Sequence, residues 1–244
     1  MNREMISVCI ATFNGGKYIR EQIMSVLPQL NEKDEIIISD DGSTDDTIYI
    51  LESLHDQRIK IYVNEREHGF IWNFENALMK SSGDIIFLCD QDDVWKADKV
   101  EVTLKALNDH DIVLHDAEII NKEGVRTGIL YSASLHKREG FWSNLWKTRW
   151  LGCCMAFRRK VLEYALPFPR HIVGHDGWIS AVGLVRFNYY YIPDVLMWYR
   201  RHGDNASTAS GKSDHSWYYK LIQKRLCMII EIGRRLLQKE ILGE

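Results

Sequence analysis

Three carboxylates stand within four residues of one another, at Asp90, Asp92 and Asp93, directly after the apolar run 85–89. Carboxylates this close repel one another, and a cation placed among them removes that repulsion. Carboxylate oxygens are the ligands that Mg²⁺ and Mn²⁺ prefer, and these ions usually bridge to phosphates. The cluster therefore predicts a divalent cation site for a phosphorylated ligand. A solvated acidic turn is the alternative interpretation.

Two more polar groups follow apolar runs. Thr12, Phe13 and Asn14 come after residues 6–11, and the pair Asp40 and Asp41 comes after residues 35–39. A carboxylate beyond a strand can accept hydrogen bonds from a base or a ribose hydroxyl, and an aromatic ring can stack on a base. These residues predict a nucleotide site. The alternatives are a core position for the phenylalanine and a helix-start turn for the acidic pair.

The elements that must position these groups alternate along the first half of the chain. Continuous apolar runs predict strands over 6–11, 35–39, 59–63, 85–89 and 112–114. Apolar residues spaced by three to four predict a helix over 18–30, and further helices are expected over 71–79 and 97–108. Another helix is expected after the acidic turn, with Ser43 or Thr44 as its cap and its end near residue 54. Strands of this kind are covered on both faces, so we expect an α/β fold with a mostly parallel sheet and helices on both faces. Ligands then bind beyond the carboxyl ends of the strands, where the polar groups gather.

Composition excludes several classes. The chain has 244 residues, 45% of them hydrophobic, and a formal net charge of -3, which gives no drive toward nucleic acid. Its five cysteines contain no CxxC pair, which argues against a zinc ribbon and favours buried thiols in a reducing compartment. No stretch approaches the roughly 20 apolar residues that cross a bilayer. We expect a cytoplasmic protein, with a peripheral position at the inner face of the plasma membrane as a further possibility.

The second half is less regular and richer in aromatic residues. Residues 217–242 predict an amphipathic helix with basic side chains, which could lie on an anionic membrane surface or pack as an ordinary helix. The Ser/Gly-rich stretch 207–213 is the one plausible flexible join. We therefore expect a nucleotide-binding half over 1–115, an acceptor-binding half of the same domain over 116–206, and a C-terminal helical segment over 207–244.

Three motifs together resemble the inverting glycosyltransferases of family 2. They are Ser7 to Asn14, the acidic turn Asp40 to Asp45, and Cys89 to Trp95, in this order and with plausible separations. The Asp-Gln-Asp-Asp-Val-Trp form and the later stretch 198–205 look most like bacterial rhamnosyltransferase-type enzymes. Those enzymes build surface polysaccharides such as O-antigen or capsule. The resemblance implies the type A glycosyltransferase fold.

The resemblance also implies roles for single residues. Asp92 and Asp93 match the metal-binding aspartates of the family, for Mn²⁺ or Mg²⁺, and Asp176 falls where the family carries its catalytic base. His175 replaces the acidic residue that usually precedes that base. Trp178 and Trp150 would provide apolar walls for the acceptor sugar. The residues expected to bind the nucleotide sugar are Ala11, Thr12, Phe13, Asn14, Asp41, Asn73, Asp90, Arg200 and His202.

The resemblance implies transfer from a nucleoside-diphosphate donor, dTDP-rhamnose or a UDP-hexose, to a glycan or polyprenyl-linked glycan. A single displacement by an acceptor hydroxyl needs one base, and the cation stabilises the leaving diphosphate. Three alternatives stay open. A nucleotidyltransferase would release pyrophosphate, a receiver-type domain would need only about half this length, and a non-catalytic module would bind the sugar nucleotide without turnover.

Overall fold

The computed structural model describes residues 3–132, Trp142, 150–202 and 217–242, and among them one mixed sheet of nine strands forms the centre. The strand order is β3-β2-β1-β4-β8-β6-β9-β5, with β7 paired to β6 off this path. The strands are β1 (Ile6–Thr12), β2 (Glu35–Asp40), β3 (Ile59–Val63), β4 (Ile85–Asp90), β5 (Val94–Trp95), β6 (Ile112–Ile120), β7 (Arg126–Leu130), β8 (Met155–Arg158) and β9 (Tyr189–Arg200).

The parallel part of the sheet is buried on both faces, as the continuous apolar runs predict. β1 pairs in parallel with β2 and with β4, and β2 pairs in parallel with β3. Side chains alternate between the faces of a strand. In β1, Val8 and Ile10 therefore enter one apolar cluster while Cys9 enters the other, and all three are fully buried.

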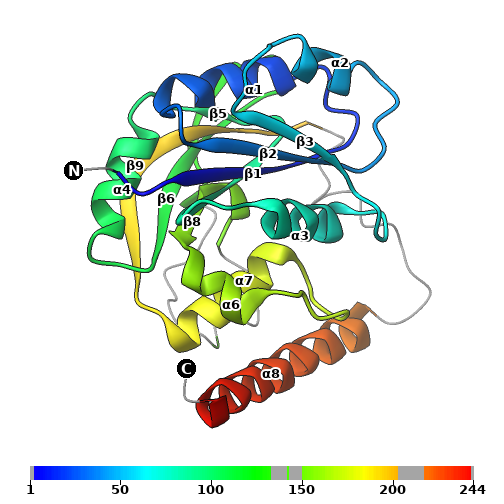
Figure 1. Cartoon of the computed structure of the whole chain (residues 1–244), viewed down its shortest axis with the longest axis vertical. Coiled ribbons are helices and arrows are strands. Elements are labelled where there is room, and N and C mark those ends of the chain that lie inside the picture. The colour runs from blue at the N-terminus through cyan, green and yellow to red at the C-terminus, as the bar shows by residue number, and fades with distance from the viewer. Residues whose placement is uncertain (1–2, 133–141, 143–149, 203–216, 243–244) are drawn as a thin grey trace.

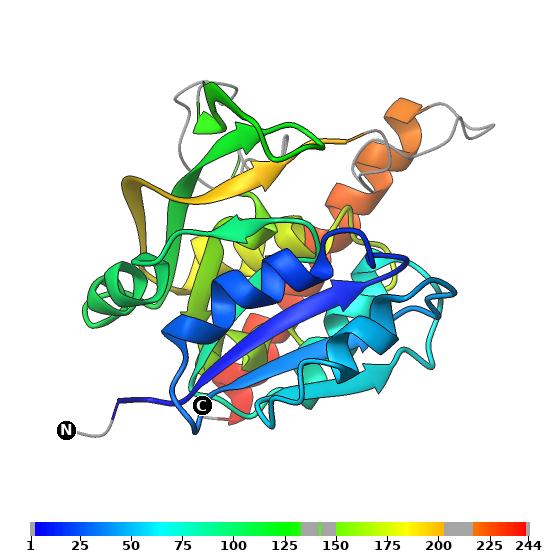
Figure 2. The same cartoon turned by 90° about the horizontal axis from the view of Figure 1, so that it is seen from above.

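Helices cover both faces of this sheet (Figures 1 and 2). One cluster holds side chains of α1, α2 and α4, and the other holds side chains of α3, α6, α7 and α8. The helices are α1 (Ile19–Val26), α2 (Thr47–Glu52), α3 (Phe70–Lys80), α4 (Lys99–Leu107), α6 (Leu162–Ala165), α7 (His175–Arg186) and α8 (Trp217–Leu242). The expected fold class is confirmed.

The second half completes the same sheet with strands that the sequence interpretation did not predict. β8 pairs antiparallel with both β4 and β6, and β9 pairs in parallel with β6 and antiparallel with β5. β6 is longer than expected, and it runs across the predicted boundary between residues 115 and 116. In β9 the apolar runs 189–192 and 195–199 are separated by Pro193 and Asp194, and most of its first half is exposed. The predicted join at 207–213 lies outside the described residues.

α8 lies on the outside of α6 and α7 (Figure 1) and packs against the domain with one side. Met228 and Ile232 are buried against the domain, and the Arg235 guanidinium lies 5.1 Å above the ring of Trp178. The outer side instead carries an exposed apolar row, which consists of Leu226, Ile230, Leu237 and Ile241. Within the described chain, no helix combines the length and the apolar character that a membrane span requires.

Candidate active site

The carboxyl ends of β1, β2 and β4 bring the predicted polar groups to one edge. In the sheet register Thr12 pairs with Asp40, and Ala11 pairs with Asp90. The Gln91 side chain connects the loop after β4 to the loop after β1 by two hydrogen bonds. Its Oε1 accepts from the Phe13 N–H at 2.9 Å, and its Nε2 donates to the Phe13 carbonyl at 3.1 Å. Phe13 itself is 53% exposed, so its ring can contact a ligand.

The loop after β2 is organised by Asp40 rather than by a helix cap. Asp40 accepts hydrogen bonds from the Thr12 hydroxyl and from the backbone N–H and hydroxyl of Ser43. The Ser43 oxygen accepts from the Asn14 N–H at 2.9 Å, and the Asn14 side chain accepts from the Thr44 N–H at 2.8 Å. The predicted cap at Ser43 or Thr44 is therefore wrong: α2 begins after Asp46 and has no side-chain cap.

Asp41 is buried under the loop that follows β3. Its two oxygens accept from the Asn64 side chain and from the Gly69 N–H, both at 2.7 Å, and the exposed His68 ring lies 3.3 Å away. Asn73 is buried beside it and donates to the Thr12 carbonyl at 3.0 Å, while its own Oδ1 has no hydrogen-bond partner among the described residues. A carboxylate oxygen has two lone pairs, so Asp41 keeps acceptor capacity.

Asp92 and His202 come into contact from distant parts of the chain. His202 Nε2 lies 2.7 Å from Asp92 Oδ2, and both side chains are largely but not fully buried. The separation is that of a hydrogen bond. Carboxylate and imidazole are also two groups that bind divalent metals, so the pair is a candidate for holding a cation.

Arg200 is a positioning residue for the acidic loop. Its guanidinium is buried and donates to the Asp92 carbonyl at 2.8 Å and to Glu21 at 2.7 Å, and its backbone N–H donates to Asp93 at 3.0 Å. The guanidinium also lies 4.7 Å above the ring of Tyr18. Because these contacts hold the side chain inside the fold, the expected direct contact of Arg200 with a diphosphate is not supported.

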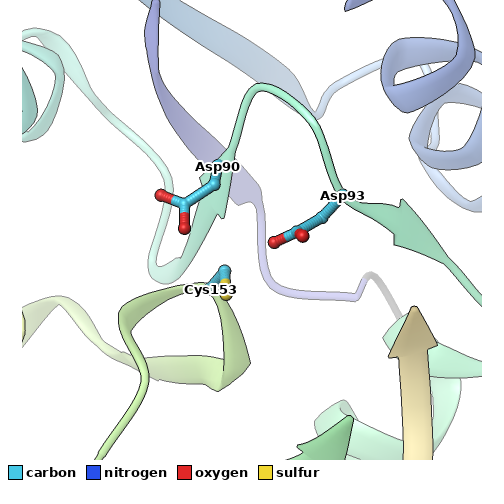
Figure 3. Close-up of side chains that lie close together, drawn as sticks. All are labelled: Asp90, Asp93 and Cys153. Atoms are coloured by element: carbon cyan, nitrogen blue, oxygen red, sulfur yellow. The ribbon is translucent and has the colours of Figure 1, made fainter. Parts of the chain in front are cut away.

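Asp90, Asp93 and Cys153 form a second group of neighbouring side chains (Figure 3). One carboxylate oxygen from each aspartate and the cysteine sulfur all lie within 4.8 Å of one another. Burial and the charge of Asp92 raise the pKa of Asp90 to about 7, and the same two causes raise the pKa of Asp93. Asp93 is fully buried, so it is less accessible to a phosphate than Asp92.

Asp176 stands in the first turn of α7, where the helix dipole and the backbone N–H groups face it. Its Oδ1 accepts from the Gly177 N–H at 2.7 Å, yet burial raises its pKa to about 6. It lies near enough to Asp90 for its charge to contribute to the raised pKa of that residue. His175 stacks on Phe74 at 3.9 Å between ring centroids, and burial lowers its pKa to about 3.

The two tryptophans expected to line an acceptor site are placed differently. Trp178 has 0% exposed surface and donates from its indole nitrogen to the Ala165 carbonyl at 2.8 Å. It is a core residue, so the predicted contact with an acceptor is wrong for this side chain. Trp150 is half-buried and packs against Tyr189 with ring centroids 5.1 Å apart. Residues 203–205 of the stretch 198–205 lie outside the described residues.

Several residues of the site were not predicted as functional. Gln91 and His68 lie in loops whose contacts only folding defines, and Glu21 reaches Arg200 from 179 positions away. Cys153 was interpreted as one of several core thiols. The adjacent pair of cysteines was the only signal that could have drawn attention to it.

Comparison with known proteins agrees with this geometry. The family model described as "Glycosyl transferase family 2" matches residues 7–165. The chain belongs to glycosyltransferase family 2. A family 2 protein of Haemophilus influenzae named only as an uncharacterized glycosyltransferase is 30% identical over 227 residues, 85% of this chain and 68% of that one. The Escherichia coli enzyme WfgD, named a UDP-Glc:alpha-D-GlcNAc-diphosphoundecaprenol beta-1,3-glucosyltransferase, is 27% identical over 75% of this chain and 71% of its own.

Solved family 2 structures share the fold. Residues 1–349 of Staphylococcus aureus TarS, in complex with UDP-GlcNAc, superpose with a TM-score of 0.73 at 19% identity, covering 93% of this chain and 67% of that TarS fragment. The Pyrobaculum calidifontis mannosyltransferase PcManGT, in complex with GDP-Man and Mn²⁺, gives a TM-score of 0.62 at 16% identity, covering 100% of this chain and 77% of that one. This family 2 protein is therefore a glycosyltransferase, which excludes the nucleotidyltransferase and receiver alternatives. None of the relatives named here is described as a rhamnosyltransferase.

Proposed function

We propose that this protein transfers a hexosyl group from a UDP-hexose to a lipid-linked glycan, with inversion at the anomeric carbon and with a divalent cation. The observation that carries the proposal is the convergence of Asp92 with His202 and of Asp176 with Asp90 at the carboxyl edge of the sheet. This edge is where open α/β sheets bind their ligands. A dTDP-linked donor is the second candidate, since both nucleotides carry a pyrimidine.

The nucleotide would lie over the ends of β1 and β2. The exposed ring of Phe13 offers a stacking face for a base, and Asp41 offers a fixed acceptor for a base N–H. Asn64 and Gly69 hold Asp41 in one orientation, so the acceptor is placed before the nucleotide binds. Pre-organisation of this kind reduces the ordering cost of binding.

Asp92 and His202 would hold the cation. Mn²⁺ or Mg²⁺ bound there would act as a Lewis acid on the diphosphate oxygens of the leaving group. Arg200 donates a hydrogen bond to the Asp92 carbonyl, and Gln91 of the same loop accepts one from the Phe13 N–H. Asp92 would thereby be held in one position to meet His202, and fixed positions of the ligands favour a defined ligand geometry.

Asp176 would remove the proton from the acceptor hydroxyl. A general base works best when its pKa lies near the working pH, and burial places the pKa of Asp176 at about 6. The Gly177 N–H holds one carboxylate oxygen and leaves the other to accept the proton. One base and one displacement give inversion of the anomeric centre without a covalent enzyme intermediate.

The acceptor class is proposed from relatives and from α8. WfgD is named for an undecaprenol-linked acceptor, and a lipid-linked acceptor requires the enzyme to work at a membrane. The exposed row of Leu226, Ile230, Leu237 and Ile241 supports a peripheral contact with that membrane. Such a contact would place the protein at the cytoplasmic face of the plasma membrane, where nucleotide sugars are available.

A thermal-shift screen with Mn²⁺ and a panel of UDP-, dTDP- and GDP-sugars tests the donor, because a ligand that binds only the folded state raises its melting temperature. We expect UDP-hexoses to give the largest shift and chelation of the metal to abolish it. The donor chosen in this way is then incubated with a polyprenyl-diphosphate-linked sugar, and UDP release and the anomeric configuration of the product are measured. Absence of any Mn²⁺-dependent shift would overturn the proposal, and retention of configuration would overturn the assigned mechanism.

A further inference from the structure

We propose that Phe70, the first residue of α3, is the aromatic platform on which the acceptor sugar lies while Asp176 removes its proton. The inference rests on the proposed function and adds a residue that binds the acceptor, a role that the buried Trp178 cannot fill. Phe70 is 40% exposed, whereas Phe74, which follows in the same helix, is buried. Its ring is therefore available to a ligand.

Phe70 and Asp176 come from two different helices and are neighbours of the same glycine. A Cβ added to Gly174 would lie 2.7 Å from Asp176 Oδ1 and 4.0 Å from Cε2 of the Phe70 ring. Asp176 is partly exposed, so both side chains can be reached by one ligand. A hydroxyl group bound at the carboxylate would bring its sugar ring next to Phe70.

The Phe70 ring is held by the imidazole of His175. The two rings meet edge to face, with centroids 5.8 Å apart and planes at 72°. The imidazole itself is stacked on Phe74 at 3.9 Å, and on Gly152 an added Cβ would come within 2.7 Å of its Nε2. Neither ring nitrogen of His175 has a hydrogen-bond partner among the described residues, so this histidine acts here by packing.

The backbone before Phe70 is fixed by the nucleotide side of the site. Gly69 has a φ of 125°, a conformation that favours glycine, and its N–H donates to Asp41 at 2.7 Å. The Gly69 carbonyl accepts from the Asn73 N–H at 3.1 Å, which begins α3. The position of Phe70 is thus set before any sugar binds.

The placement of Phe70 indicates the acceptor sugar rather than the donor. The proposed cation ligand His202 lies on the side of α1, because its ring is 5.2 Å from that of Tyr18 at the start of this helix. Phe70 and Asp176 belong to α3 and α7, which cover the other face of the sheet together with α8 (Figure 1). An inverting displacement brings the acceptor to the face of the donor sugar opposite the leaving group. The acceptor would then enter from the α3 and α7 side, which is also the side of the proposed membrane contact.

The chemistry of the pair selects a pyranose. A pyranose such as GlcNAc has a face of C–H groups, and the negative face of an aromatic ring attracts the positive ends of such bonds. Ligand sites combine apolar walls of this kind with a few polar groups that fix the orientation. Phe70 would supply the wall, and Asp176 would supply the polar contact to the reacting hydroxyl.

The test measures acceptor binding directly, without donor, metal or turnover. The full chain is titrated by calorimetry with farnesyl-diphosphate-linked GlcNAc and with sugar-free farnesyl diphosphate, whose difference gives the contribution of the sugar. Phe70→Leu is expected to weaken binding of the sugar-linked probe by roughly tenfold and to leave the Kd for UDP with Mn²⁺ within about twofold. Phe70→Tyr keeps a ring and is expected to bind the probe within about threefold of the parent chain.

Phe13→Leu is the matched control, because it makes the same change at a phenylalanine that is 53% exposed at the nucleotide site. It is expected to show the reverse pattern, with weaker UDP binding and unchanged binding of the sugar-linked probe. Urea denaturation checks that Phe70→Leu folds, and Phe70→Met, which also lacks a ring, carries the test if it does not.

Unchanged affinity of the variant without the ring for the sugar-linked probe overturns the inference. So does an equal loss of the probe and of UDP, or a parent chain that binds the two farnesyl probes equally. If the parent chain shows no Mn²⁺-dependent UDP binding but its affinity for the sugar depends on Phe70, the proposed function fails and the sugar platform stands. Normal UDP binding and sugar transfer with no effect of Phe70→Leu would leave the proposed function standing and overturn the platform.

Discussion

The imidazole of His202 lies 2.7 Å from the carboxylate of Asp92, although the two residues are 110 positions apart in the chain. The contact joins the loop after β4 to the segment after β9, and both side chains are partly exposed. Asp93, the other aspartate expected to bind the cation, is turned inward and fully buried. The geometry therefore divides the acidic cluster into an outer part and an inner part.

Asp92→Asn and His202→Asn are each expected to weaken Mn²⁺-dependent binding of UDP by about tenfold to a hundredfold, because each removes one of the two cation ligands. Calorimetry with UDP at fixed Mn²⁺ measures the effect. His110→Asn, at the opposite end of β6, is the control and is expected to bind UDP normally. Unchanged UDP affinity in both site variants would show that the cation does not bind between these residues.

Asp176→Asn is expected to lower kcat by about 10²- to 10⁴-fold while the Kd for UDP stays within about twofold, since general base catalysis contributes that much and the carboxylate does not hold the nucleotide. Single-turnover transfer and calorimetry measure the two quantities. If the variant keeps most of its kcat, another residue is the base. If it loses nucleotide binding as well, the effect is structural.

The pH profile should report the same carboxylate. Burial raises the pKa of Asp176 to about 6, so its ionised, proton-accepting form is lost as the pH falls through 6. At saturating Mn²⁺ we expect kcat/KM to fall about tenfold per unit below pH 6 and to be level above it. UDP affinity measured at each pH is the control for the titration of the cation site. If kcat/KM instead begins to fall only near pH 4, the carboxylate of Asp176 is not desolvated during catalysis.

Arg200→Gln is expected to lower the free energy of unfolding by about 2 kcal/mol, because the change removes charged hydrogen bonds from a buried position. It should also raise the KM for the donor, because the Asp92 carbonyl loses the 2.8 Å hydrogen bond that it accepts from the Arg200 guanidinium. Urea denaturation and steady-state kinetics measure these effects. Arg201→Gln changes the exposed neighbouring arginine and is expected to leave both quantities unchanged. Equal stability of the two variants would contradict the positioning role.

The outer side of α8 should bind anionic membranes. Ile230 is 69% exposed, and replacing both Ile230 and Leu237 by Glu removes two apolar contacts and adds two negative charges. Sedimentation with phosphatidylglycerol-containing vesicles is expected to show binding that weakens roughly tenfold or more in this double variant. Gln223→Glu with Gln238→Glu adds the same charges and should weaken binding much less. If both double variants lose the same fraction of vesicle binding, the effect is electrostatic and the apolar row is not the contact. If the parent chain does not bind vesicles, the proposed membrane contact is wrong.

The parallel half of the fold could be predicted because its determinants are local. The runs at Ile36–Ile38 and Ile85–Cys89 are apolar without alternation, and that pattern suits strands covered on both faces. The same local reasoning placed Asp41 and Asp92 at strand ends. β9 could not be predicted in this way, because Pro193 interrupts its apolar residues and its partners lie in distant segments.

The sequence by itself determined which residue types gather at the carboxyl edge, because continuous apolar runs predict parallel strands and polar residues follow them. Only the tertiary structure decided the order of the strands, which aspartate is partly exposed and which is fully buried, that Arg200 supports the loop from within, and that Trp178 belongs to the core. Burial and side-chain direction depend on elements far apart in the chain, as the contact of Arg235 in α8 with Trp178 in α7 shows. The residues next to Arg235 or Trp178 in the sequence do not indicate that the two side chains are in contact.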